Sequence, residues 1–135
     1  MMYIPIHFYS PSQQLSMLRG KYKEGTFRSL SNSSWEWLYS LQPREMSPSY
    51  KIKIVYKKYF FKVFVLDKLR LADNQNKLPH VYDNEKQQIC LYYSSREWNA
   101  SKSITIVVPW ISEWLYFYEI WLITGEWCGG GIHRE

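Results

Sequence analysis

The stretch from Ile104 to Ile123, ITIVVPWISEWLYFYEIWLI, constrains the fold more than any other part of the chain. It is long enough for a membrane span, but Glu113 and Glu119 would each cost about 2 kcal/mol or more in mid-bilayer, and Pro109 interrupts the run. The sequence therefore favours a short strand followed by a helix that begins near Pro109 and ends before TGEWCGGG. One face of this helix must be thoroughly buried: Trp110, Trp114, Leu115, Tyr118, Trp121 and Leu122.

Three stretches before this helix alternate with the two-residue period of a β-strand. Residues 31–43 form the first and stop at Pro43, and their aromatic side carries Trp35, Trp37, Tyr39 and Leu41. Residues 50–58 and 59–67 predict two further strands, close enough in sequence to form a hairpin or meander.

Lysines alternate with apolar residues in the second of these strands: Lys51, Lys53 and Lys57 with Ile52, Ile54 and Tyr56. This pattern puts ammonium groups on one face of a strand and apolar groups on the other, which is typical of a solvated sheet face. The net charge of +5 leaves a second interpretation open, in which the face from Lys51 to Lys62 binds nucleic acid. Without a recognised binding motif, the solvated face is favoured.

Two other segments complete the predicted order of elements. Residues 12–28 carry Leu15, Leu18 and Tyr22 at helical spacing and predict an N-terminal helix, although Gly20 and Gly25 weaken it. Residues 68–88 are polar and rich in Asn and Asp, which predicts an irregular connection with no regular element. A chain of 135 residues is long enough for one core, so we expect a single α+β domain over residues 1–135.

Cys90 and Cys128 are the two cysteines, too few for a disulfide scaffold. A closed zinc site would need His80, His133 and a carboxylate to converge on them. We therefore predict reduced thiols in the cytoplasm, with no metal and no cofactor. The N-terminal residues lack the pattern of a secretory signal.

Seven tryptophans are more than a small core buries comfortably, so some are expected to form an exposed patch that meets another protein. Trp35, Trp37 and Trp127 are the candidates. Strand alternation makes the first two equally good core residues.

Cys90 directly follows the polar connection, within the apolar segment ICLYY. A nucleophilic thiolate must be reachable, and Lys86 and Arg96 could lower its pKa if they fold near it. Backbone N–H groups of an irregular segment could stabilise an oxyanion, but no His-Asp pair indicates a general base. The alternative is a core cysteine, since Cys is among the most buried residue types.

The spacing around Cys90 resembles that of ubiquitin-conjugating enzymes. His80 stands ten residues before Cys90 in an Ile-Cys-Leu context, and Trp98 follows eight residues later. In that family a His-Pro-Asn element opens the active-site segment. Val81 and Tyr82 occupy the Pro and Asn positions here, so the asparagine amide is missing and the Tyr82 hydroxyl is a candidate oxyanion donor. We expect His80 to hydrogen-bond the loop backbone and Trp98 to pack beneath the segment.

Residues 78–133 more closely resemble bacterial ubiquitin-conjugating-like proteins of anti-phage CBASS operons. The shared pattern runs from Pro-His-x-Tyr through Cys-Leu-Tyr to a Trp- and Leu-rich helix and Thr-Gly-x-Trp. The resemblance implies a ubiquitin-conjugating-like fold in which Cys90 forms a thioester with the C-terminus of a cGAS-like cyclic-nucleotide synthase. The chain is too short to include an adenylating domain, so activation would come from a separate enzyme. The alternative is a catalytically silent member that binds and positions the synthase.

Overall fold

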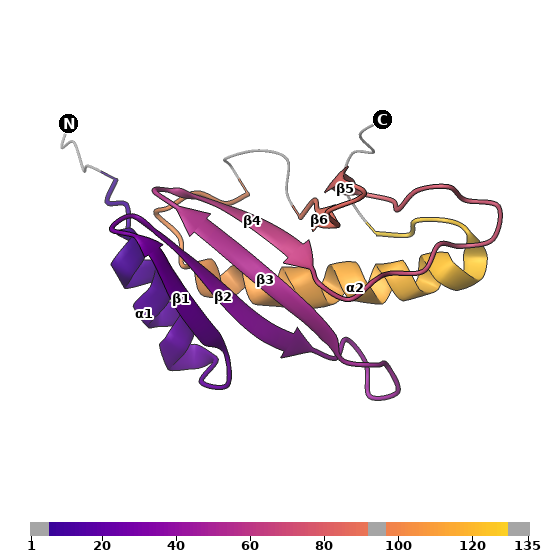
Figure 1. Ribbon diagram of the computed structural model, residues 1–135, viewed down its shortest axis with the longest axis horizontal. Coiled ribbons are helices and arrows are strands. Elements are labelled where there is room, and N and C mark those ends of the chain that lie inside the picture. The colour runs from indigo at the N-terminus through magenta and orange to yellow at the C-terminus, as the bar shows by residue number, and fades with distance from the viewer. Residues whose placement is uncertain (1–5, 92–96, 130–135) are drawn as a thin grey trace, which may run out of the picture.

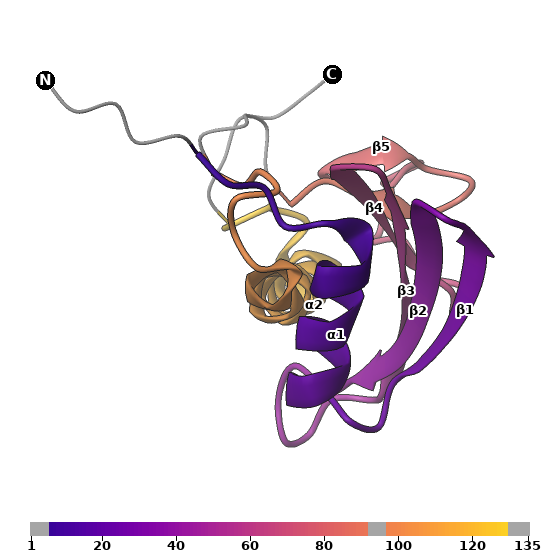
Figure 2. The ribbon, with the colours of Figure 1, turned by 90° about the vertical axis from the view of Figure 1, so that its left-hand side faces the viewer.

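The computed structural model describes residues 6–91 and 97–129, which build a six-stranded antiparallel sheet with both helices on one of its faces (Figures 1 and 2). The strands are β1 (Thr26–Ser31), β2 (Ser34–Leu41), β3 (Tyr50–Lys57), β4 (Phe60–Val65), β5 (Val81–Asp83) and β6 (Gln88–Ile89). Their spatial order is β1-β2-β3-β4-β6-β5. The helices are α1 (Pro11–Lys21) and α2 (Val107–Thr124), the latter preceded by the 3₁₀ turn η1 (Ile104–Ile106). The predicted α+β class is confirmed.

Helix α1 begins at a capping box in which Ser10 and Gln13 bond each other's backbone N–H groups. The predicted helix over residues 12–28 was wrong at its C-terminal end, because the helix stops at Lys21 and Thr26–Ser31 form β1. A Cβ on Gly25 would overlap the Trp37 indole, so this glycine lets the chain pass close over the ring as it enters β1. Pairing with β2 then outweighs the local helical pattern.

The aromatic side of β2 faces the helices. Trp35 and Trp37 are 3% and 0% exposed, so of the two alternatives that the sequence leaves open for them, an exposed patch or the core, the structure shows the core. Trp35 stacks on Tyr56 of β3 with ring centroids 5.1 Å apart, and its indole N–H donates to the Pro11 carbonyl. Tryptophan on this strand therefore joins α1 to the sheet.

The outer face of the sheet carries the alternating lysines. Ile52, Ile54 and Tyr56 of β3 are fully buried, whereas Lys51 and Lys57 are exposed. The hairpin of β3 and β4 pairs in the predicted order, with Ile54 opposite Val63. Its lysines form the solvated side that the alternation predicted.

The connection over residues 68–88 contains more regular structure than predicted. β5 and β6 pair as a short antiparallel hairpin at the edge of the sheet, with Val81 opposite Ile89. Asp83 caps the turn by accepting the backbone N–H of Lys86, and Gln87 adopts a positive φ of 55°. Specific turn contacts, rather than apolar periodicity, build this hairpin.

Helix α2 begins two residues before Pro109, close to where the sequence predicted. The predicted strand over the ITIVV segment was wrong, because these residues form η1 and the first turn of α2. Buried Gln14 of α1 holds this segment by accepting the Ile104 N–H and donating to the Lys102 carbonyl. By length and composition Ile104–Thr124 could span a membrane, but here its apolar face packs on the sheet as a core helix does.

Candidate functional site

Cys90 and His80 lie side by side at the open end of the β5–β6 hairpin, opposite its turn. His80 directly precedes β5 and Cys90 directly follows β6. The His80 carbonyl accepts the Cys90 backbone N–H at 3.0 Å and the Trp114 indole N–H of α2 at 3.1 Å. One backbone oxygen therefore uses both lone pairs to tie the cysteine and the helix together. This hydrogen bond holds the backbone of Cys90.

His80 itself is held in an uncommon backbone conformation. Its φ is 45°, in the left-handed region that few non-glycine residues adopt. Its imidazole stacks on the Trp127 indole, with ring centroids 4.9 Å apart and an interplanar angle of 20°. The ring contact and the two bonds to its carbonyl offset the cost of this conformation.

The Cys90 residue is 9% exposed, less than the sequence interpretation of an open polar loop suggested. Lys86 lies exposed in the β5–β6 turn, and Arg96 and His133 lie outside the described residues. Within residues 6–91 and 97–129, no three His, Cys, Asp or Glu side chains gather as metal ligands. Cys128 is an exposed free thiol.

Tyr82 and Trp98 occupy very different environments. Tyr82 is 47% exposed on β5, where a phenol can reach a ligand in solvent. Trp98 is 1% exposed and packs edge-on against Phe61 of β4 at 4.9 Å, while its indole N–H donates to the Ser103 carbonyl. Tyr82 therefore lies at the surface of the sheet edge, and Trp98 is packed in the core.

Gln87 braces the hairpin from inside, a role that the sequence did not reveal. Its side-chain amide donates to the carbonyls of Val65 and Asp67, and its side-chain oxygen accepts the Leu69 N–H. Burial of an amide with all these partners fixes the hairpin to the end of β4.

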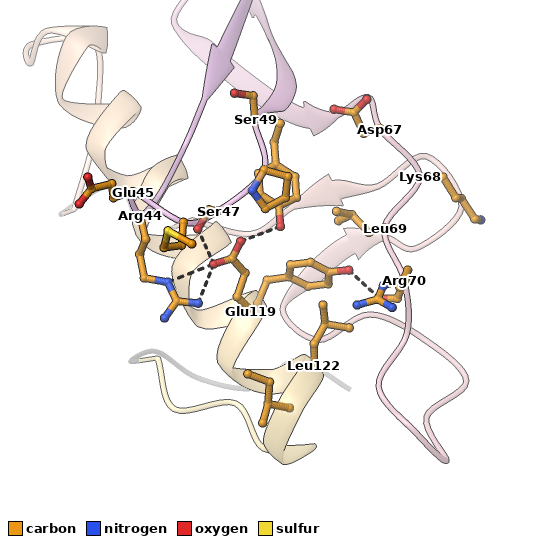
Figure 3. A pocket seen from close by; sticks show the side chains of 15 residues that line it. Arg44, Glu45, Ser47, Ser49, Asp67, Lys68, Leu69, Arg70, Glu119 and Leu122 are labelled. Carbon is orange, nitrogen blue, oxygen red and sulfur yellow. Dashed lines mark hydrogen bonds and ion pairs between the residues drawn. The ribbon is translucent and has the colours of Figure 1, made fainter.

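A second polar site lies at the other side of α2, where an open groove of about 900 Å³ runs between the β2–β3 loop and residues 67–70 (Figure 3). Glu119, 7% exposed, points toward this loop from the helix. Its Oε1 accepts bonds from Arg44 (3.0 and 3.2 Å) and the Ser47 hydroxyl (2.7 Å), and its Oε2 accepts the Tyr50 hydroxyl at 2.8 Å. We call these four residues the Glu119 clamp.

The tyrosines of this groove are held neutral. Burial, followed by the hydrogen bond to Glu119, raises the pKa of Tyr50 above its ordinary value. Burial also raises the pKa of Tyr118, whose hydroxyl donates to the Arg70 carbonyl. In the sequence, Glu119 indicates only that the segment does not suit a membrane. Its position beside the apolar face of α2 is the signal that could have predicted its burial.

The order of the elements and the place of Cys90 define a class of protein. A helix, an antiparallel meander, a cysteine after a short hairpin and a long final helix match the layout of a ubiquitin-conjugating-like protein. A family model described as Type II CBASS E2 protein matches residues 7–134. The chain belongs to this family. Comparison with curated proteins gave no match.

Proposed function

We propose that the protein is a cysteine transferase that forms a thioester through Cys90 with the C-terminus of a cGAS-like synthase, and thereby regulates the synthase in anti-phage defence. The observation that carries the proposal is the fixed position of Cys90. Its backbone is bonded to His80, and that residue is held in turn by α2 through Trp114. Membership in the Type II CBASS E2 family supports the same chemistry.

The transfer requires an acyl group that has already been activated. The Cys90 thiolate attacks the carbonyl carbon of an acyl adenylate or thioester at the synthase C-terminus. A sulfur–carbon bond forms, the bond to AMP or to the donor thiol breaks, and the leaving group departs with the electron pair. The thiol proton passes to solvent or to the departing thiolate. A separate activating enzyme that consumes ATP would supply the activated acyl group.

The developing oxyanion needs a donor other than the backbone of Cys90. That N–H is already bonded to the His80 carbonyl at 3.0 Å. We assign the donor role to the Tyr82 hydroxyl, which takes the place of the family asparagine and lies on the adjoining strand at 47% exposure.

The test is co-expression with a cGAS-like synthase and its activating enzyme, followed by gel analysis with and without thiol. We expect a band of summed mass that disappears with thiol and in Cys90→Ala. Cys128→Ala is the matched control, because it removes the exposed cysteine and should leave the band intact. A thiol-labile band that persists in Cys90→Ala would overturn the proposal.

A catalytically silent binding partner is the second candidate, and the low exposure of Cys90 favours it. A cysteine that serves only in packing needs no access for an acyl chain. In this case no thiol-labile band forms, and Cys90→Ala leaves co-purification with the synthase and phage resistance intact. Loss of resistance in Cys90→Ala, with the complex preserved, would exclude the silent role.

A further inference from the structure

We propose that Trp127, in the segment that follows α2, is a positioning residue that holds the His80–Cys90 contact in place. Its indole forms one wall of a ring cluster with His80, Trp114 and Phe117, at centroid distances of 4.9, 5.6 and 6.0 Å. His80 and Trp114 are also the two residues that meet at the His80 carbonyl. Trp127 therefore contacts both partners of the Trp114–His80 hydrogen bond, and the same His80 carbonyl accepts the N–H of Cys90.

The turn after α2 is built to return the chain onto this cluster. Gly125 ends the helix in the left-handed conformation, with φ of 75°, and its N–H donates to the Trp121 carbonyl. The Thr124 hydroxyl accepts the Glu126 N–H at 3.1 Å. Both hydrogen bonds fix the direction of the backbone after α2. This direction places the Trp127 indole against His80.

Gly129 secures the indole from the other side. A Cβ added there would lie 2.8 Å from Trp127 Nε1 and 3.0 Å from Phe117 Cδ2. A Cβ essentially never lies as close as 2.8 Å to a neighbouring heavy atom, so a larger residue would displace the indole or the chain. The close passage of the backbone confines Trp127 between Gly129 and the helix.

Stacking, not hydrogen bonding, carries the role of Trp127. Its Nε1 is buried and has no hydrogen-bond partner in the part of the chain that the structure describes. The ring stack on His80 is nearly parallel, a geometry that favours aromatic contact. Because the left-handed φ of His80 is uncommon, losing the stack should release the residue and, through its carbonyl, the backbone of Cys90.

This inference rests on the proposed thioester chemistry only for its effect on transfer, so the experiment has two readouts. Cys128→Ser is the background, which leaves Cys90 as the one thiol that iodoacetamide can alkylate. Mass spectrometry gives the alkylation rate of Cys90, and the co-expression gel gives thioester formation. The variants are Trp127→Ala, Trp127→Phe and, as a matched half-buried tryptophan at the start of α2, Trp110→Ala. All rates are measured well below each variant's unfolding midpoint.

In Trp127→Ala we expect the two readouts to move in opposite directions. Alkylation of Cys90 should rise about tenfold as the hairpin opens locally, whereas thioester formation should fall by about ten- to a hundredfold as the sulfur loses its position. Trp127→Phe should restore both to within about threefold, because a ring still stacks on His80. Trp110→Ala should match the parent in both.

Unchanged alkylation in folded Trp127→Ala would overturn the inference, as would equal effects of Trp110→Ala and Trp127→Ala. If Trp127→Ala does not fold, Gly129→Ala provides a second test, since its Cβ would crowd the indole without deleting it. If the parent forms no thioester, the proposed function fails, but faster alkylation in Trp127→Ala would still support the positioning role.

Discussion

The Cys90 end of the β5–β6 hairpin and the Glu119 clamp are both anchored on α2, yet they use the helix differently. At the hairpin, α2 contributes the Trp114 N–H, which reaches the backbone carbonyl of His80. At the clamp, α2 contributes the carboxylate of Glu119, which accepts four hydrogen bonds from the β2–β3 loop and the start of β3. The contact at the hairpin fixes backbone atoms, whereas the contacts at the clamp occupy the side-chain carboxylate of Glu119.

This difference implies that the clamp serves the stability of the fold and that the hairpin serves the position of Cys90. Both oxygens of the Glu119 carboxylate accept hydrogen bonds that hold the loop, so its contacts serve the fold. The hairpin instead holds Cys90 through its N–H, so its position is fixed by a contact that does not involve the reacting atom. Changes at the clamp should therefore lower stability and spare transfer, and changes at the hairpin should do the reverse.

The largest effect should come from Glu119→Ala. The hydroxyls of Ser47 and Tyr50 would lose their buried acceptor, which should lower the free energy of unfolding by about 3 kcal/mol. Alkylation of Cys90 in the folded protein should not change. Urea titration gives the first quantity, with Glu113→Ala, an exposed acid on the same helix, as the control. A loss below about 1 kcal/mol would show that the clamp is dispensable.

Much of the sheet was predictable because burial follows strand alternation. Trp37 and Ile54 lie where a two-residue period puts them, and they pair across β2 and β3. Residues 26–31 were not predictable as a strand, because the helical spacing of Leu15, Leu18 and Tyr22 extended the predicted helix to residue 28, whereas pairing with β2 makes residues 26–31 a strand. At Gly25 the backbone passes close to the Trp37 ring, so tertiary packing and not local sequence determines where the helix ends and β1 begins.

The site was predictable in its spacing and not in its bonding. His80 stands ten positions before Cys90, as in the family pattern, and the structure joins the two by a backbone hydrogen bond. The double use of the His80 carbonyl depends on a backbone direction that no residue type encodes. The return of Trp127 onto His80 depends on the left-handed turn at Gly125, which sequence alone suggested only as a helix end.

Tyr82→Phe should affect transfer at the hairpin and leave stability nearly unchanged. Removing an oxyanion donor should slow thioester formation by about a hundredfold, while loss of one exposed hydroxyl should change stability by less than about 0.5 kcal/mol. Single-turnover transfer from the activated synthase measures the rate. Tyr59→Phe, at similar exposure in the β3–β4 turn, is the control. Equal rates for the two variants would remove Tyr82 from the mechanism.

Tyr50→Phe should destabilise the protein less than Glu119→Ala near neutral pH, and it should have a distinctive effect in alkali. The variant loses one bond to Glu119, which Arg44 and Ser47 still contact, so the expected cost at pH 8 is about 1.5 kcal/mol. In the folded protein burial and the Glu119 hydrogen bond raise the pKa of Tyr50 above the value of about 10 that it has when unfolded. The neutral phenol is therefore the form that the fold favours.

It follows that the stabilisation from Tyr50 is complete below pH 10 and is lost as the pH rises above it, because the unfolded chain then ionises while the folded one does not. Between pH 8 and pH 10.5, the parent should lose about 1 kcal/mol that Tyr50→Phe does not lose. Urea titrations at the two pH values measure the difference, and Tyr59→Phe should lose as much as the parent. Identical losses in the parent and Tyr50→Phe would mean that the phenol ionises freely in the folded protein. In that case the Glu119 clamp would not stabilise the neutral form of Tyr50.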